Sequence, residues 1–151
     1  MASREESIRS EIRRCDGATP EILRQIDVAL EESPSAELWI LRGDAIQLSD
    51  GLTHTVADAE QSYLRAAELE PLSSFAYESL GYFHLAVMDD AATAKTFFER
   101  ALALGGGESS SEGLRNAMTE LRARNFKEVV DEINQKYSGV FRRLSEYDHR
   151  R

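Results

Sequence analysis

The sequence predicts an all-α protein, built as a stack of about three helical hairpins that ends in an amphipathic capping helix. Hydrophobic residues recur at the three- and four-residue spacing of helices through most of the chain. One arrangement of large and small residues also occurs twice, since Trp39 and Gly43 are matched by Tyr77 and Gly81. Such constant intervals are typical of stacked hairpins, because each hairpin must bury one face on its neighbour.

Residues 3–34 predict a degenerate first hairpin. Ile8 and Ile12 stand one helical turn apart in an otherwise charged helix, and Thr19 and Pro20 suit the cap and first turn of a second helix. In the second helix, Ile22, Ile26 and Ala29 are the inner residues and Pro34 is the helix breaker. The spacing of these four residues is the same as in the second helices of the later hairpins. A terminal hairpin is expected to be atypical because its outer face meets water.

Two complete hairpins are expected in residues 36–71 and 72–106. In each, a second helix with small residues, an aromatic ring and a terminal breaker follows the first. These positions are Ala59, Tyr63, Ala66 and Pro71 in one hairpin, and Ala94, Phe98, Ala101 and Gly106 in the other. The expected helices span about 36–48, 56–69, 74–87 and 91–104. Gly43 and Gly81 would allow the paired helices to approach closely, with aromatic rings filling the gaps.

Residues 108–147 predict one C-terminal capping helix or two. The stretch GGGESSSEG at residues 105–113 has the composition of a connection between helices. Apolar residues then keep the helical period, and a break near Asn125 would divide the segment. The later apolar positions are Phe126, Val129, Val130, Ile133, Tyr137, Val140, Phe141 and Leu144. This stripe must cap the open end of the stack or be buried on another chain, and we expect the cap first.

The repeated spacing resembles the tetratricopeptide repeat (TPR), a helix-turn-helix of roughly 34 residues with the signature W-x2-L-G-x2-Y, A-x3-F-x2-A and P. Residues 77–106 follow this signature closely, with His84 at the tyrosine position. In residues 39–71, Arg42 replaces the leucine and Ile46 replaces the tyrosine. Residues 3–34 would be a weak further copy.

The resemblance implies a non-catalytic scaffold that binds a partner segment in a concave groove, lined by the first helix of each repeat. The positions that would line this groove are Glu37, Ile40, Asp44, Gln47, Phe75, Glu78, Tyr82 and Leu85. Relatives that grip a C-terminal carboxylate use Lys, Arg and Asn at matching places, whereas Ile40, Asp44 and Ser79 stand here. The acidic and apolar mixture favours a basic or amphipathic partner segment.

A second function is left open, in which the C-terminal helix is an assembly module that self-associates or docks on another protein. The residues that would make this contact are Phe126, Val130, Ile133, Tyr137, Phe141 and Leu144. Their stripe is wider than a cap requires, so a homodimer through this helix is the second expectation.

Charge and composition narrow the class of partner. The 151 residues include 27 acidic and 18 basic side chains, giving a formal net charge of -9. This balance speaks against nucleic acid, whose phosphates require a basic surface. It fits either an acidic docking surface or one that only aids solubility. With a single cysteine, Cys15, and no apolar run of membrane-spanning length, we expect a soluble, cytoplasmic protein.

The sequence holds no constellation of residues that indicates catalysis. The glycines at 105–107 lack the lysine of a phosphate-binding loop. His54, His84 and His149 have no metal-ligand spacing, and Asp89-Asp90 is more typical of a helix cap. We therefore expect no enzymatic activity, no cofactor and no metal.

Overall fold

The computed structural model describes residues 3–15, 17–49 and 54–148, with side chains described as far as residue 136 and at residue 138. Within these ranges the protein is all-helical and contains no strand. The helices are α1 (Arg4–Arg14), α2 (Pro20–Glu32), α3 (Ala36–Gln47), α4 (Val56–Leu69), α5 (Ser74–Ala86), α6 (Ala91–Ala103) and α7 (Glu108–Asp148). The all-α prediction is confirmed.

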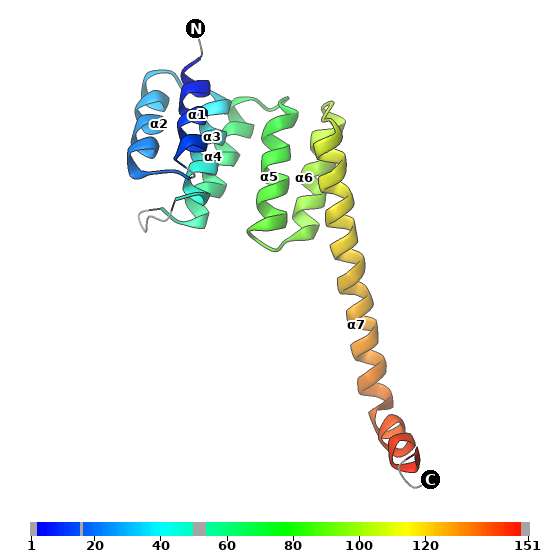
Figure 1. Cartoon of the computed structure of the whole chain (residues 1–151). Coiled ribbons are helices and arrows are strands. Elements are labelled where there is room, and N and C mark those ends of the chain that lie inside the picture. Colours follow the sequence, from blue (N-terminus) through cyan, green and yellow to red (C-terminus); the bar gives the residue numbers. More distant parts are fainter. Residues whose placement is uncertain (1–2, 16, 50–53, 149–151) are drawn as a thin grey trace.

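Consecutive helices pack in pairs, and the pairs lie side by side. The strongest packing joins α3 to α4, α5 to α6, and α6 to α7, while α2 on α3 and α4 on α5 link one pair to the next. Figure 1 shows this row of helices, with α1 and α2 at one end and α7 at the other. The pairs α3–α4 and α5–α6 therefore lie next to each other, while α1 packs on both α2 and α3.

Side-chain caps explain where most of these helices begin. A Ser, Thr or Asp side chain accepts a hydrogen bond from the third residue of the following helix at Ser3, Thr19, Ser35, Thr55 and Asp90. Thr55 and Asp58 complete a reciprocal capping box, and the backbone N–H of Thr55 holds the pKa of Asp58 below its usual value. The predicted caps at Thr19 and Asp90 are confirmed.

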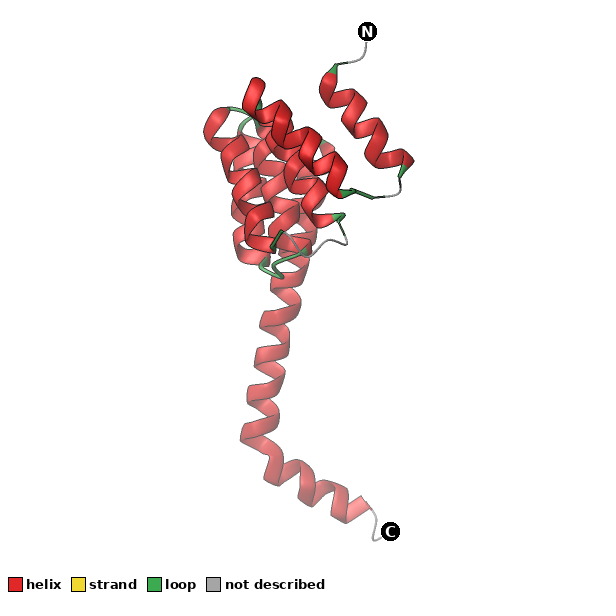
Figure 2. Cartoon of the chain, turned by 90° about the vertical axis from the view of Figure 1, so that its left-hand side faces the viewer, coloured by secondary structure: helices red, strands yellow, loops and turns green. Residues whose placement is uncertain are grey.

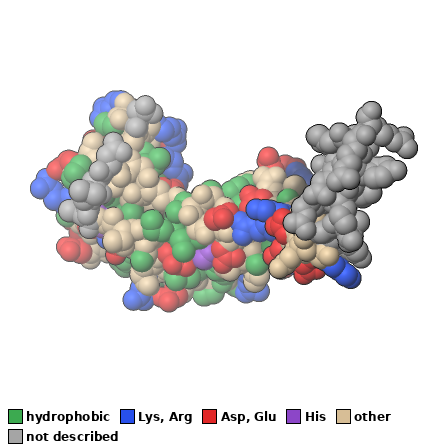
Figure 3. Space-filling model, turned by 90° about the horizontal axis from the view of Figure 1, so that it is seen from below, with side chains coloured by type: hydrophobic (Ala, Val, Ile, Leu, Met, Phe, Trp, Pro, Cys, Tyr) green, Lys and Arg blue, Asp and Glu red, His purple; other side chains and the backbone are tan. Residues whose placement is uncertain are grey.

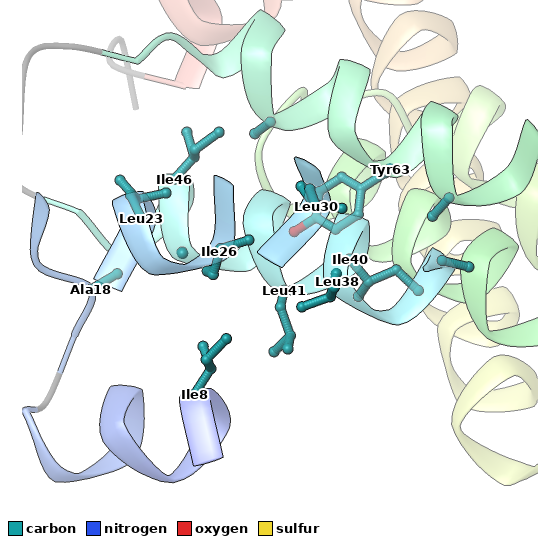
Figure 4. Close-up of a cluster of buried hydrophobic side chains, with 14 of the residues drawn as sticks. Ile8, Ala18, Leu23, Ile26, Leu30, Leu38, Ile40, Leu41, Ile46 and Tyr63 are labelled. Atoms are coloured by element: carbon teal, nitrogen blue, oxygen red, sulfur yellow. The ribbon is translucent and has the colours of Figure 1, made fainter. Parts of the chain in front are cut away.

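The core is continuous through the first five helices and is made of aliphatic side chains with two buried aromatic residues, Tyr63 and Phe83. Figure 4 shows a large part of it, including Tyr63. A Cβ added at Gly43 would come within 2.6 Å of the Tyr63 ring. At Gly81 the same addition would come within 2.7 Å of the Phe98 ring. In both hairpins a glycine of the first helix therefore admits an aromatic ring of the second, as the spacing predicted.

Arg42 forms a polar bridge at the position where the repeat that the sequence resembles has a leucine. Its Nε donates to Asp27 of α2 at 2.8 Å, and its Nη1 donates to the buried Ser62 hydroxyl of α4 at 2.9 Å. The guanidinium also lies over the Trp39 ring, 5.9 Å from its centroid. One side chain thus joins three helices, which offsets the loss of an apolar contact.

Residues 105–113 do not form a long connection, because α7 begins at Glu108. Gly105 adopts a φ of 88°, and the N–H of Gly106 bonds to the carbonyl of Ala101 at 2.9 Å, so α6 ends in a tight turn. The question of one C-terminal helix or two is also answered, since α7 is continuous past Asn125.

The expected cap is formed by the first part of α7, and the expectation for residues 126–144 is wrong where side chains are described. Ser110 and Ala117 are fully buried, and Leu114 packs on Phe98 and Ala94. Residues 122–129 and 131–136 are exposed. Figures 1 and 2 show the reason, because α7 continues well beyond the stack.

Candidate functional site

A cavity of about 320 Å³ lies where α3, α4 and α5 meet. Its lining residues are Asp44, Gln47, Tyr63, Phe75, Glu78, Ser79, Tyr82, Phe83 and Ala86. We call it the α3–α5 groove. Five of the eight positions expected to line a groove come together here: Asp44, Gln47, Phe75, Glu78 and Tyr82.

The other three expected positions lie elsewhere. Glu37 is exposed and forms an ion pair with Arg9 of α1 at 3.0 Å. Ile40 is only 2% exposed and belongs to the core, so it offers no surface to a partner (Figure 4). Leu85 packs against the cluster formed by Phe98 and α7.

One side of the groove holds a hydrogen-bonded carboxylate. The Tyr63 hydroxyl donates to Asp44 Oδ1 at 2.7 Å, and the Gln47 amide donates to the same hydroxyl. Burial raises the pKa of Asp44, although the bond from Tyr63 opposes this rise. Burial and the neighbouring Asp44 carboxylate raise the pKa of Tyr63, so its hydroxyl stays protonated and remains a donor. The groove thus contains a partly desolvated acid.

The other lining residues belong to α5, and two of them are hydrogen-bonded to the start of α7. The buried Ser110 hydroxyl donates to Glu78, and the Tyr82 hydroxyl donates to the Ser109 carbonyl at 2.8 Å. Sequence reasoning missed these serines because their segment had the composition of a connection. The hydrogen bonds fix the orientation of Glu78 and Tyr82 beside the cavity.

Between these polar sides the groove is aromatic. Phe75 is 48% exposed, whereas Phe83 is buried with its ring centroid 5.5 Å from that of Tyr63. In the view from below, the outline of the molecule is curved, and green apolar and red acidic side chains intermingle along it (Figure 3). The groove can therefore accept apolar and cationic groups together.

The two histidines that the structure describes, His54 and His84, lie in different surroundings, and His149 lies outside the described residues. His84 is 7% exposed, stacks near Phe97 with a centroid distance of 5.2 Å, and has Nε2 3.2 Å from Glu60 Oε1. His54 lines a separate cavity of about 280 Å³ beside α4. Among the described residues, no three His, Cys, Asp or Glu side chains are grouped to hold a metal ion.

The residues expected to support self-association form an exposed apolar strip on α7 as far as they are described. Phe126 is 71% exposed and Ile133 is 45% exposed, while Val130 is half-buried. The side chains of Tyr137, Phe141 and Leu144 lie outside the described residues. None of the helices described is both long enough and apolar enough to cross a membrane.

Comparison with known proteins identifies no relative. No protein-family model matches the chain, and no characterised protein matches it significantly. Two surfaces of this molecule are therefore the candidate functional sites, the α3–α5 groove and the exposed strip of α7.

Proposed function

We propose that the protein is a non-catalytic adaptor that binds a basic or amphipathic partner segment in the α3–α5 groove, consistent with its resemblance to the TPR. The observation that carries this proposal is that two carboxylates, Asp44 and Glu78, line one cavity together with the half-exposed Phe75. A cationic side chain flanked by an apolar one matches this arrangement.

The energetics of Asp44 support a cationic occupant. Its pKa is raised because the ionised carboxylate loses solvation inside the protein. A lysine or arginine side chain from a partner would bring an opposite charge to this site and lower that pKa again. Binding of a basic segment and ionisation of Asp44 should therefore favour each other.

The dimensions of the groove suit a segment better than a folded domain. Its volume of about 320 Å³ is at the lower end of the range for small-molecule pockets, enough for one or two side chains. The remainder of a partner helix would lie along the acidic helices of the stack. Residues 35–107 contain eleven acidic and four basic side chains, so this contact should weaken at high salt.

The test uses two synthetic helical peptides, one with lysines on its polar face and one with glutamines there. We expect the full chain to bind the lysine peptide and the variant Asp44→Lys/Glu78→Lys to bind at least tenfold more weakly, by fluorescence anisotropy. The control is Glu70→Lys/Glu112→Lys, which makes the same charge change at two exposed positions outside the groove. Equal losses in both variants would show that only overall charge matters and would contradict the proposal.

A second function is favoured by one separate observation, the exposure of large apolar side chains on the part of α7 that leaves the stack. We propose that this part is a docking or assembly surface, since such residues in a row usually mark a protein contact. Light scattering of the full chain and of the variant Val130→Glu/Ile133→Glu distinguishes self-assembly from docking on another protein. Self-assembly predicts a species larger than the monomer for the unmodified chain and a monomer for the variant.

A further inference from the structure

The apolar residues of α7 beyond the stack follow the spacing of a coiled-coil seam. Phe126, Val130 and Ile133 are separated by four and then three residues, and the sequence continues this alternation at Tyr137, Val140 and Leu144. The average repeat of 3.5 residues keeps one stripe in register with a second helix. We call these six positions the α7 seam.

The described residues of the α7 seam, Phe126, Val130 and Ile133, lie on the side of the helix away from the one that packs on the stack. Ile133 follows Ala117, which is fully buried on that side, by 16 positions. At about 100° per residue, the two Cβ atoms lie roughly 160° apart around the helix axis. The helices that cover Ala117 therefore cannot cover the seam.

The exposed part of α7 also lacks packing that would hold it helical. Residues 122–129 and 131–136 are exposed, and Val130 between them is only half-buried. Helices in water depend mainly on packing of an apolar face, and isolated segments of this length are marginal. A second helix on the seam would supply this packing.

The charges beside the seam decide which helix fits. With Phe126 and Ile133 at d positions and Val130 at a, the neighbouring e and g positions include Arg122, Lys127 and Lys136 and no acid among the described residues. The acids of this stretch, Glu128, Asp131 and Glu132, occupy f, b and c positions farther from the seam. Residues at e and g set partner choice in coiled coils.

A second copy of this chain is a poor match for these flanks. In a parallel pair, Arg122 of one copy would face Lys127 of the other, because g residues meet the e residues of the following heptad. In an antiparallel pair, basic g positions would face one another. Both arrangements place like charges side by side, which disfavours pairing.

We propose that the α7 seam binds an α-helix of a different protein, one with apolar a and d residues and acidic e and g residues. This inference rests on the second function proposed above and specifies its partner. Binding would stabilise residues 122–148 as a helix and leave the α3–α5 groove open for its own occupant. The interaction is heteromeric, and it should weaken as salt screens the flanking charges.

The test uses the full chain and two synthetic peptides of four heptads with identical apolar a and d residues, one with Glu and one with Lys at every e and g position. The background is Asp44→Lys/Glu78→Lys, so that groove binding of the Lys peptide does not contribute. We expect the Glu peptide to bind at least tenfold more tightly than the Lys peptide in fluorescence anisotropy, and as a one-to-one complex in light scattering.

Three variants on this background identify the surface. Val130→Glu/Ile133→Glu should abolish binding, and Asn125→Glu/Gln135→Glu, which adds the same charge at exposed c and f positions, should leave most of it. Lys127→Glu/Lys136→Glu should reverse the preference toward the Lys peptide. Equal affinity for both peptides, or a self-assembled chain that the Glu peptide does not dissociate, would overturn the proposal. Neither outcome bears on the groove, which is tested by its own variants.

Discussion

The two parts of α7 differ in how residue size relates to burial. Residues 108–121 pack with small side chains, and both Ser110 and Ala117 are fully buried. Beyond Arg122 the side chains are larger, yet Phe126 and Ile133 are exposed. Small residues bring the first part close to α5 and α6, whereas the second part extends past the stack, and Arg124 ties its beginning to Asp89 between α5 and α6. A hydrophobic stripe in the sequence thus identifies a helix face that is favoured to be buried, but it does not identify the packing partner.

The largest difference between the two parts should appear when an aromatic ring is removed. Phe98 is 0% exposed and packs between α5 and α7, so Phe98→Ala should lower the free energy of unfolding by about 3–5 kcal/mol. Phe126 is 71% exposed, and Phe126→Ala should change it by less than about 0.5 kcal/mol. Urea unfolding followed by circular dichroism measures the free energy of unfolding of both variants. Similar losses of stability in the two variants would contradict the comparison.

A smaller effect on the free energy of unfolding is expected when one methyl group is added at Gly113 in the first part of α7. A Cβ at Gly113 would come within 2.3 Å of the Phe98 ring, which also lies close to Gly81. Overpacking costs about 1–3 kcal/mol, against a gain of about 1 kcal/mol in helix propensity, so Gly113→Ala should destabilise by up to about 2 kcal/mol.

The matched substitution in the outer part is Asn125→Ala, at an exposed helical position. It should be neutral or slightly stabilising, because only propensity changes. Thermal unfolding of the two variants shows which of them is less stable, and we expect this to be Gly113→Ala. A stabilised Gly113→Ala protein would mean that the ring has room to move.

The smallest effect is expected at the boundary between the two parts. Arg124 donates to the Asp89 carbonyl at 3.0 Å and pairs with the Asp89 side chain. Both groups are largely solvated, so Arg124→Ala should cost less than about 1 kcal/mol overall. Hydrogen exchange should nevertheless accelerate in residues 122–136 more than it does for Arg122→Ala. An unchanged exchange rate would show that this contact does not anchor the helix.

The sequence predicted the helices of residues 36–104 well because their signals are local and physical. The cap at Thr55 and the breaker at Pro71 bound α4, whose limits agree with the expectation. Residues 108–113 were assigned to a connection because glycine and serine suggested a turn, whereas Gly113 serves close packing and Ser110 bonds to Glu78. Composition alone does not distinguish these roles.

The groove was predicted in part, for a reason that lies in the stacking. Helix α3 packs on both α2 and α4, so two of its sides are apolar and Ile40 falls on a buried one. Tyr63 was assigned to packing alone, although its hydroxyl reaches Asp44 at the groove. A single sequence gives the period of a helix, but it does not tell how many neighbours surround that helix.

The continuity of α7 sets a spacing between two potential occupants. Ser110 forms part of the groove surroundings, and Phe126 begins the seam, so about 24 Å of helix axis separates them at 1.5 Å per residue. A partner that carries both a basic segment and an acidic helix would gain effective concentration for its second contact only if its linker spans this distance. The length of one helix would then select among partners by their geometry, in addition to their charge.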